Sequence, residues 1–390
     1  MKTIRIRIVI YLLLVGLSTS GQTIEDLAFG TDTTFEVMTW NIEWFPKNGQ
    51  VTVDYVIDII EALDVDLLAI QEVDDVTEFE QMMENLISYN GYLESSWFAG
   101  LAYIYKPDII QINDIYEIYT TSPYWSPFPR SPMVMDLNYE NERIIVINNH
   151  FKCCGDGILD ITNPDDEETR RYYASNLLKE YIDIHFPNEN VIVLGDLNDI
   201  LSDSPQNNVF QLILDDVENY LFTDYEIAMG DNSEWSYPTW PSHLDHILIT
   251  NELFDDFEND SSIISTIKID EYLTGSWLEY EENISDHRPV ALKLNMNSSL
   301  GSTDLTLTTP YFSNYPNPFY SKTTFSFKFP NDYMNIEILN MQGQTVFTEQ
   351  IPIGETSIIW NAEEFPNGVY LAKMKSKNNV LATLKLMLLK

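Results

Sequence analysis

Short apolar runs separated by polar turns recur along most of this chain. Runs rich in β-branched and aromatic residues predict strands at 35–40, 66–71, 101–106, 133–137, 143–151, 190–196, 245–250 and 288–294. Apolar residues spaced by three or four positions predict helices at 51–63, 78–89, 167–184 and 206–215. Several strands follow one another without an intervening helix, so the sheet should be mixed or largely antiparallel. This many strands favour two packed sheets, and residues 33–295 therefore read as one α/β domain.

The pattern changes after residue 295. Residues 296–310, "MNSSLGSTDLTLTTP", are small and polar, which is typical of a linker. From 311 to 390, short alternating runs are separated by turn sequences such as "MQGQ" and "FPNGV". This spacing predicts a second, small all-β domain, an immunoglobulin-like sandwich.

Charge marks the same boundary. Residues 22–300 hold 54 Asp and Glu against 11 Lys and Arg, whereas residues 301–390 hold seven of each. The whole chain has a formal net charge of −40. Such an acidic body repels polyanions at long range, which counts against a tight nonspecific DNA binder that depends on Lys and Arg contacts to phosphates.

The first 21 residues have the pattern of a secretory signal peptide. Lys2, Arg5 and Arg7 precede an apolar run at 8–17 that is too short to span a bilayer, and small residues follow it. Cleavage is expected near Ser20 or Gly21; an uncleaved anchor or a buried core helix is the alternative. No other run reaches transmembrane length, so we expect an exported protein with no stable membrane span after processing.

The only two cysteines, Cys153 and Cys154, are neighbours in "NNHFKCCGDG". Export favours their oxidation, although adjacent Cα atoms lie closer than an ordinary disulfide prefers. A strained vicinal disulfide is the first expectation and two free thiols the second. A metal site with His150 is a weaker alternative, because zinc would lack a fourth ligand.

Polar residues suited to catalysis stand at strand ends, where enzymes often place their sites. Each is weak alone, since an Asp beside Gly or Asn is usually a turn residue. The set comprises Asn41, Glu72, His150, Asp196, Asn198, Asp245, Asp286 and His287.

The order of the surrounding motifs is more specific. "WNIEWF", "AIQEVDD", "NNHFK", "GDLND", "HLDHI" and "SDHRPV" follow one another between residues 33 and 295. In this order they resemble the endonuclease/exonuclease/phosphatase family, which includes enzymes of the deoxyribonuclease I and apurinic endonuclease type. The resemblance implies a four-layer sandwich of two mixed or antiparallel sheets flanked by helices, with the active site at one rim.

Phosphoester cleavage requires charge neutralisation at the phosphoryl oxygens and an activated water. Glu72 is the best candidate metal ligand, because a hard carboxylate suits Mg²⁺ or Mn²⁺, with Ca²⁺ as an alternative. The resemblance implies that Asn41 and Asp286 complete this shell.

The remaining motif residues divide the catalytic work. Asp245 and His287 read as an acid–imidazole pair, in which the ring is a general base or a cation that stabilises phosphate. Asp196 would orient or deprotonate the attacking water, and Asn198 would donate a hydrogen bond to phosphate. His150 would stabilise the transition state or protonate the leaving group.

Three further residues are candidate substrate contacts. Lys152 lies two residues after His150, hence on the same face of an extended strand. Arg130 resembles the family's phosphate-contacting arginine. Tyr103 occupies a place where relatives often have a site tyrosine.

The tail carries a separate resemblance. "NYPNPF", "IEILNMQGQTV" and "WNAEEFPNGVYLAKM" are similar to the C-terminal sorting domain of the type IX (Por) secretion route. This implies an interaction with the outer-membrane secretion machinery and a secreted or cell-surface location.

Three functions are compatible with these patterns. The first is a secreted metal-dependent phosphodiesterase, foremost a nuclease acting on extracellular nucleic acid. The second is a hydrolase of another phosphoester, either a sphingomyelin-type lipid or a small phosphate ester. The aromatic segments 120–130 and 234–241 could form a lipid-binding hairpin, or equally core or substrate-stacking loops. The third is a noncatalytic surface binding protein on the same fold.

Overall fold

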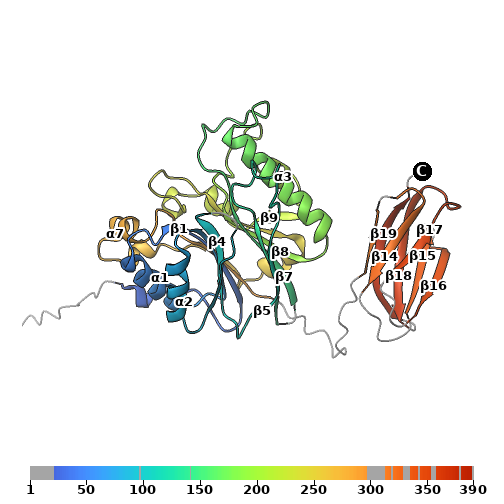
Figure 1. Cartoon of the computed structure of the whole chain (residues 1–390), viewed down its shortest axis with the longest axis horizontal. Helices are drawn as coiled ribbons and strands as arrows, with labels where there is room; N and C mark the ends of the chain where they lie inside the picture. The colour runs from blue at the N-terminus through green and yellow to red at the C-terminus, as the bar shows by residue number, and fades with distance from the viewer. Residues whose placement is uncertain are drawn as a thin grey trace, which may run out of the picture. The chain divides into compact units, whose positions relative to one another are not determined.

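The computed structural model describes residues 22–95, 98–140, 142–296, 312–317, 319–327, 334–340, 343–352, 357–376 and 379–388. The expected signal peptide lies outside the described residues, as does nearly all of the expected linker. The chain divides into two compact units between Ser298 and Ser299 (Figure 1), each of which is considered by itself below.

The first unit contains two six-stranded sheets. The first sheet has the order β11-β12-β1-β2-β4-β3, and the second has the order β5-β6-β7-β8-β10-β9. Only β1 with β2, and β7 with β8, pair in parallel among the described strands of this unit. The strands are β1 (Phe35–Phe45), β2 (Leu67–Val73), β3 (Asn90–Tyr92), β4 (Gly100–Tyr105), β5 (Gln111–Glu117), β6 (Met133–Tyr139), β7 (Glu142–His150), β8 (Asn190–Asp196), β9 (Tyr220–Phe222), β10 (Asp245–Thr250), β11 (Ile263–Thr266) and β12 (Val290–Leu294).

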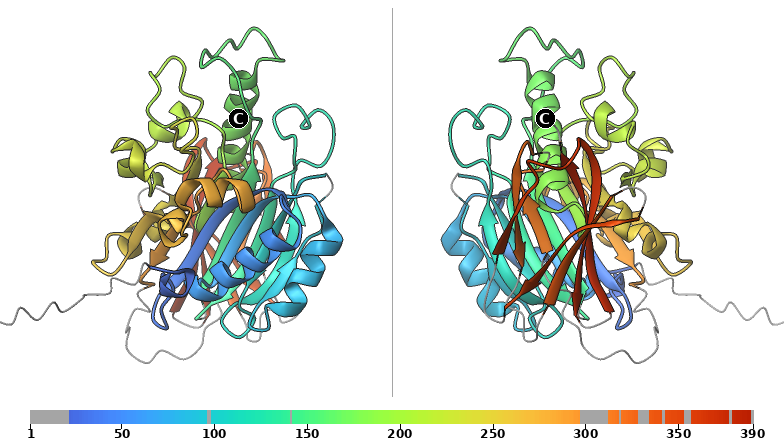
Figure 2. Two further views of the ribbon diagram at one scale, coloured as in Figure 1. Left: turned by 90° about the vertical axis from the view of Figure 1, so that its left-hand side faces the viewer. Right: turned by 90° about the vertical axis from the view of Figure 1, so that its right-hand side faces the viewer.

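Helices cover the outer faces of both sheets. The helices of this unit are α1 (Gln50–Leu63), α2 (Val76–Asn85), α3 (Glu167–His185), α4 (Gln211–Leu214), α5 (Tyr225–Ala228), α6 (Phe254–Phe257) and α7 (Ser276–Asn283), with short 3-10 turns at Ile24–Asp26, Asn232–Glu234, Asn251–Leu253 and Ile269–Tyr272. The left view of Figure 2 looks onto α1 and α2 over the first sheet, and Figure 1 shows α3 on the opposite side. The expected four-layer α/β sandwich is therefore confirmed.

Three apolar clusters hold these layers together. One lies between the sheets and includes Phe35 and Ile192, one joins the first sheet to α1 and α2, and one joins the second sheet to α3. Strands buried on both faces explain why their sequences are nearly continuous apolar runs rather than alternating ones.

One predicted helix is much shorter than expected. The apolar spacing at 206–215 predicts a helix over that range, but only Gln211–Leu214 is helical. Asn208 accounts for the difference, because its side chain donates to the carbonyl of Leu201 and accepts from the N–H of Phe210. A side chain that bonds to nearby backbone groups competes with helix formation.

Strand direction brings the polar motif residues to one rim. The parallel pairs β1/β2 and β7/β8 place the carboxyl ends of these strands at common edges. Strand β10 runs antiparallel to β8 with Asp245 opposite Asp196, so the start of β10 meets the end of β8. The segment before β12 reaches the end of β1 in the same way.

The second unit is all-β. A three-stranded sheet of order β13-β14-β17 and a four-stranded sheet of order β16-β15-β18-β19 enclose an apolar core around Trp360. The indole is fully buried and contacts four aromatic rings. The strands are β13 (Phe312–Tyr315), β14 (Lys322–Phe327), β15 (Met334–Asn340), β16 (Thr345–Ile351), β17 (Ser357–Asn361), β18 (Gly368–Ser376) and β19 (Asn379–Leu388). The expected small β-sandwich is confirmed.

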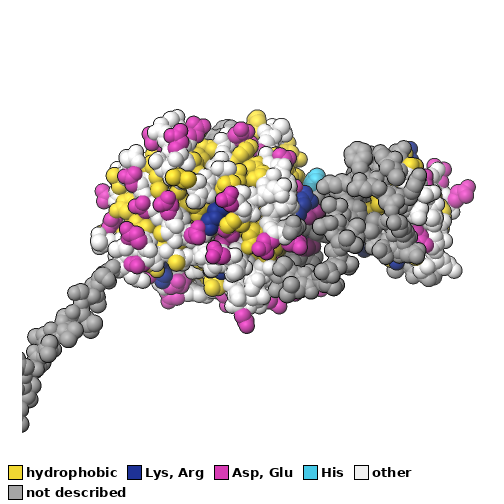
Figure 3. Space-filling model, turned by 90° about the horizontal axis from the view of Figure 1, so that it is seen from below, with side chains coloured by type: hydrophobic (Ala, Val, Ile, Leu, Met, Phe, Trp, Pro, Cys, Tyr) yellow, Lys and Arg dark blue, Asp and Glu magenta, His cyan; other side chains and the backbone are white. Residues whose placement is uncertain are grey.

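The surface of the first unit carries the charge imbalance seen in the sequence. On the face drawn in Figure 3, acidic side chains are spread over the first unit and basic side chains are few. Within the described residues, no helix has the length and apolar character needed to cross a membrane.

Candidate active site

A cavity of about 370 Å³ opens at the rim where the motif residues meet. Its lining combines acidic, imidazole and aromatic side chains from strands of both sheets, which is the composition expected of a polar catalytic site. The lining residues are Glu43, Trp44, Glu72, His150, Cys153, Cys154, Asp196, Asn198, Tyr237, Ser242, Leu244, Asp286 and His287.

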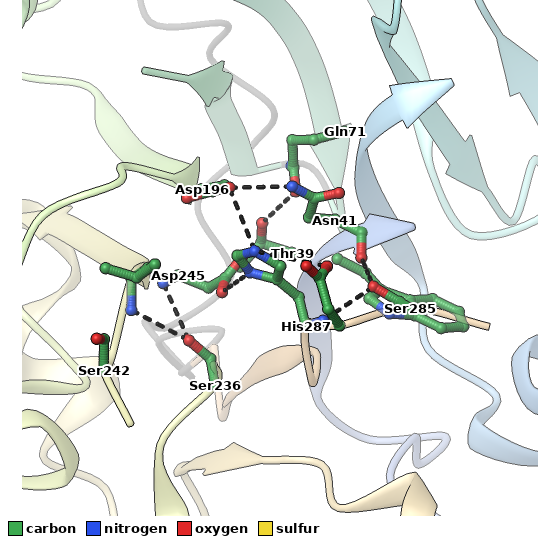
Figure 4. A network of polar contacts seen from close by, with 12 residues as sticks. Thr39, Asn41, Gln71, Asp196, Ser236, Ser242, Asp245, Ser285 and His287 are labelled. Carbon is green, nitrogen blue, oxygen red and sulfur yellow. Dashed lines mark hydrogen bonds and ion pairs between the residues drawn. The ribbon is translucent and has the colours of Figure 1, made fainter. Parts of the chain in front are cut away.

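Asp245 and His287 form the expected acid–imidazole pair. His287 Nδ1 lies 2.7 Å from Asp245 Oδ2, and both residues are buried (Figure 4). Burial alone would lower the pKa of His287, but the charges of Asp245 and Asp196 outweigh it and raise this pKa to about 10. The ring is therefore a cation in this arrangement, which favours charge stabilisation over the role of general base.

Hydrogen bonds from neighbouring residues fix the backbone on both sides of the His287 side chain. Its N–H donates to Ser285 Oγ at 3.0 Å, and that hydroxyl donates to the carbonyl of Asn41 at 2.6 Å. The carbonyl of His287 accepts from the hydroxyl of Tyr280, which in turn accepts from the indole N–H of Trp40. These contacts attach the segment before β12 to the end of β1 and orient the imidazole.

Asp196 is the buried carboxylate at the centre of the site. Its Oδ2 accepts from Asn41 Nδ2 at 3.0 Å, and its Oδ1 accepts from the N–H of Asn198 at 3.0 Å. Burial, supported by the charges of Asp245 and Glu72, raises the pKa of Asp196 to about 7 against the opposing charge of His287. Asn198 has a positive φ of 54° and lines the cavity beside it.

His150 lies on the other side of Asp196. Its Nε2 is 3.6 Å from Asp196 Oδ2 and 3.7 Å from Glu72 Oε1, while its Nδ1 is buried without a hydrogen-bond partner. Burial lowers the pKa of His150 well below its usual value, and the charges of Arg130 and His287 lower it further. The two histidines of the cavity are thus one neutral ring and one cation.

Glu72 and Asp286 present the oxygen donors that a hard divalent cation prefers. Glu72 Oε1 accepts from Asn41 Nδ2 at 3.2 Å and Oε2 accepts from the N–H of Trp44 at 3.1 Å. Asn41 points its amide nitrogen at Glu72 and Asp196, and its oxygen accepts from the N–H of Glu43 at 2.9 Å. Asn41 therefore fits the task of orienting carboxylates better than that of a direct metal ligand.

The crowding of carboxylates around this cavity also fits a cation. Glu43, Glu72, Asp196 and Asp286 line it, and of these Glu43 contacts Lys47. Asp196, Asp245 and His287 bring ligand atoms within 4.8 Å of one another, but Asp245 and His287 are already bonded to each other. The donor set that suits Mg²⁺ or Mn²⁺ is therefore the one around Glu72.

Sequence reasoning missed several cavity residues. Trp44 and Tyr237 belong to aromatic segments without a distinctive spacing, and the Tyr237 ring lies 4.8 Å from the His287 ring, between centroids. Glu43 accepts from the N–H of Asp286 at 2.8 Å, a contact between segments far apart in sequence. "WNIEWF" was the available signal, because Glu43 and Trp44 are part of it.

The structure places Tyr103 away from the cavity. The side chain is fully buried between the sheets, where its hydroxyl accepts from the N–H of Asn148 at 2.9 Å and lies 2.8 Å from the carbonyl of Met133. Its expected role as a substrate contact is therefore corrected to that of a core residue. Lys152 does not line the cavity either, because its ammonium donates to the carbonyl of Cys153.

Arg130 remains near the site. It does not line the cavity, but its charge contributes to the lowered pKa of His150, and its Nε donates to the carbonyl of Ala99 at 3.3 Å. No carboxylate of the described residues forms an ion pair with Arg130.

Cys153 and Cys154 are free, exposed thiols at the cavity wall, so the expected vicinal disulfide is not formed here. Their loop is held by α3 instead. Arg171 is buried and donates to the carbonyls of Lys152 and Cys154, while Glu168 accepts from the N–H of Gly157. The two sulfur atoms lie 2.8 Å apart in this loop.

A second histidine cluster lies on the opposite face of β10. Asp224 Oδ2 is 2.5 Å from His246 Nδ1 and 3.1 Å from His243 Nε2. The remaining ring nitrogens are also engaged, His243 by the N–H of Ser236 and His246 by the carbonyl of Asp199. His243 Nε2 has no hydrogen-bond partner among the described residues, and the three side chains bring ligand atoms within 4.8 Å of one another. The bonds of His246 to Asp224 and to the carbonyl of Asp199 anchor β10 and the loop after β8.

Two parts of the chain match known protein families. Residues 38–287 match the family model described as Endonuclease/Exonuclease/phosphatase family, and residues 313–388 match the secretion system C-terminal sorting domain. No curated protein sequence matches the chain.

Among solved structures, D. rerio TDP2 complexed with single strand DNA product is 13% identical with a TM-score of 0.50, covering 67% of this chain and 99% of that one. The human Nocturnin catalytic domain with bound sulfate anion is 14% identical with a TM-score of 0.48, covering 67% and 94%. At such low identity the first likeness supports the fold alone. With the family match over most of the first unit, the chain belongs to the Endonuclease/Exonuclease/phosphatase family.

Proposed function

We propose that this protein is a secreted, divalent-metal-dependent phosphodiesterase whose substrate is nucleic acid. One observation carries the proposal: the Nε2 atoms of His150 and His287 lie 3.6 and 3.8 Å from Asp196 Oδ2, with Glu72 beside them in one cavity. A bound phosphodiester would meet a cationic imidazole, a neutral imidazole and a buried carboxylate at the same place.

Each group has a task set by its position. Asp196 faces both rings and orients or deprotonates the attacking water, and the amide of Asn198 donates to a phosphoryl oxygen. His287, held by Asp245, stabilises negative charge on the phosphoryl group. His150, whose Nδ1 is buried, presents Nε2 to the departing oxygen.

Glu72 and Asp286 would hold the metal, with Asn41 orienting Glu72. When bound there, a divalent cation would supply Lewis-acid neutralisation of phosphoryl charge. Mg²⁺ or Mn²⁺ suits these oxygen donors. Export is supported by the match of the tail to a secretion sorting domain, which together with the expected signal peptide predicts a secreted or cell-surface enzyme.

Hydrolysis of a phospholipid headgroup is the second candidate. Tyr237 and Ser242 exchange backbone hydrogen bonds of 3.0 and 3.1 Å, which closes a hairpin beside the cavity. Trp240 within it is 75% exposed. An exposed indole on a hairpin near a phosphoesterase site would suit contact with a lipid surface.

A substrate panel tests the proposal. The full chain is incubated with supercoiled DNA, RNA, sphingomyelin vesicles and bis(p-nitrophenyl) phosphate, each with Mg²⁺ or with EDTA. Mg²⁺-dependent cleavage of DNA or RNA is expected, and it should be lost in Asp245→Asn. Cleavage of sphingomyelin alone would favour the lipid candidate, and no hydrolysis of any substrate would favour a noncatalytic binding protein.

A further inference from the structure

Two large aromatic side chains stand exposed beside the catalytic cavity. Trp44 is 49% exposed and lines the cavity, and Phe98 is 61% exposed. Their rings are stacked, with centroids 6.1 Å apart and an angle of 24° between the planes. Exposed aromatics of this size lose hydrophobic stabilisation, so a pair of them at a cavity mouth suggests a binding surface.

The backbone holds this pair in an uncommon conformation. Glu43 and Trp44 have positive φ values of 37° and 53°, and Ala99, which follows Phe98, has a φ of 48°. Non-glycine residues pay a cost in this region, and such residues concentrate at ligand-binding sites. The conformation turns the Trp44 N–H toward Glu72 Oε2, at 3.1 Å, so one backbone segment fixes both a carboxylate of the metal shell and the indole.

A cation lies next to the pair. Arg130 donates from Nε to the carbonyl of Ala99 at 3.3 Å, and its charge acts on His150 in the cavity. Arg130 thus lies close both to the backbone next to Phe98 and to the catalytic histidine. Aromatic faces beside a guanidinium match a nucleotide, whose base stacks while its phosphate binds the cation.

The charge of the molecule strengthens this assignment. With 11 Lys and Arg among residues 22–300, few phosphates of a long strand can be neutralised. Binding energy must then come from the bases, and stacking contributes about 1–3 kcal/mol per base. A base inside a duplex presents no free face, so stacking on Trp44 requires an unpaired nucleotide.

We propose that Trp44 and Phe98 form a base-stacking subsite at the mouth of the cavity, which selects single-stranded nucleic acid or unpaired strand ends. This inference rests on the proposed phosphodiesterase function. The aromatic pair supplies affinity for the base next to the scissile phosphate, and Arg130 binds a neighbouring phosphate.

Cleavage of three matched oligonucleotides tests the subsite. The full chain is assayed on a single strand, on the same strand in a blunt duplex, and on the same backbone built from abasic tetrahydrofuran units. The wild type should prefer the base-bearing single strand over both others. In Trp44→Ala, kcat/KM for that strand should fall roughly 5- to 150-fold, which corresponds to the loss of one stacked base.

The decisive quantity is the ratio of kcat/KM for the base-bearing strand to that for the abasic strand. Trp44→Ala and Phe98→Ala should move this ratio toward one, and Trp44→Phe should restore much of it. Tyr173→Ala is the matched control, because Tyr173 is 45% exposed on α3 but does not line the cavity, and its ratio should equal that of the wild type. A ratio unchanged in both alanine variants, with unchanged melting temperatures, would overturn the subsite.

A binding measurement without metal tests the subsite independently of the proposed hydrolysis. Fluorescence anisotropy of a labelled single strand, in EDTA, should show weaker binding by Trp44→Ala than by wild type or Tyr173→Ala. That result would support the subsite even if no hydrolysis were found. Equal binding by all three proteins would overturn it, as would an effect of Trp44→Ala confined to sphingomyelin vesicles, which would assign the aromatics to a lipid surface.

Discussion

Tyr103→Phe tests whether Tyr103 belongs to the core or to the active site. The Tyr103 hydroxyl accepts from the N–H of Asn148 at 2.9 Å and donates to the carbonyl of Met133 at 2.8 Å. Asn148 and Met133 are paired in the β6/β7 ladder, so the hydroxyl bridges these two strands. Removing the oxygen leaves a buried backbone N–H without a partner, which costs about 1–3 kcal/mol, and loses a donated hydrogen bond worth about 1 kcal/mol.

The expected loss of unfolding free energy is therefore about 2–4 kcal/mol, or roughly 4–16 °C in melting temperature for a unit of this size. Thermal and urea unfolding of the full chain measure it. The kcat/KM for a phosphodiester, measured well below the melting temperature, should stay within about twofold of wild type, since Tyr103 contacts neither the cavity nor its residues.

Tyr89→Phe is the matched control. Tyr89 is also buried, but its hydroxyl has no hydrogen-bond partner, so its removal should leave stability unchanged or slightly higher. Unchanged stability of Tyr103→Phe combined with a tenfold or larger loss of kcat/KM would refute the core assignment and return Tyr103 to the active site.

Three further predictions follow from buried charges and from the acidic surface. Arg171→Met should lower the unfolding free energy by about 3–5 kcal/mol, measured by urea titration, because Asp199 and Glu168 lose their buried partner. Arg171→Lys should not restore the lost stability. A loss under 1 kcal/mol in Arg171→Met would contradict a stabilising role for these ion pairs. Burial raises the pKa of Glu36 to about 8, so the folded protein retains a proton that the unfolded chain releases above pH 4.5. The unfolding free energy should therefore fall between pH 4.5 and 8, by up to about 1.4 kcal/mol per pH unit. Glu36→Gln should flatten this slope in urea unfolding at several pH values, and an identical slope would disprove the assignment. The Kd for a single-stranded oligonucleotide should rise only roughly 5- to 25-fold over a tenfold increase in salt, as expected for one or two neutralised phosphates, whereas a steeper dependence would point to a basic surface.

The sequence was sufficient to predict the layers and the rim because both depend on local patterns. Apolar runs and their order indicated two sheets, and polar residues after those runs indicated the edge where Glu72, His150 and Asp196 meet. Strand direction then brings these residues together, since the ends of parallel neighbouring strands and the starts of antiparallel ones share an edge of the sheet.

Tyr103 shows where such reasoning fails. A tyrosine in an apolar strand points either between the sheets or toward the helices, and the choice depends on pairing with distant strands. Asn148 has a related role: it sits two residues before His150, yet its side chain donates to the carbonyls of Ile70 and Ala102 and ties the two sheets together. Neither role is visible in the spacing of residues.

The exposure of Trp44 and the conformation of the cysteine loop could not be predicted from the sequence for another reason. An aromatic residue that follows an apolar run normally reads as core, and only the left-handed backbone at Glu43 and Trp44 turns this one outward. The loop with Cys153 and Cys154 takes its shape from Arg171 and Glu168 on α3. Both outcomes depend on tertiary contacts rather than on local preference.

The proposed phosphodiesterase activity requires a divalent cation at Glu72. Hydrolysis of bis(p-nitrophenyl) phosphate by the full chain is measured as Mg²⁺ is titrated into protein stripped with EDTA, for wild type and Glu72→Gln. Loss of the carboxylate should raise the half-saturating Mg²⁺ concentration at least tenfold, as expected for removal of a ligand. Equal half-saturating concentrations in the two proteins, or full hydrolysis by wild type in EDTA, would contradict a catalytic metal site at Glu72.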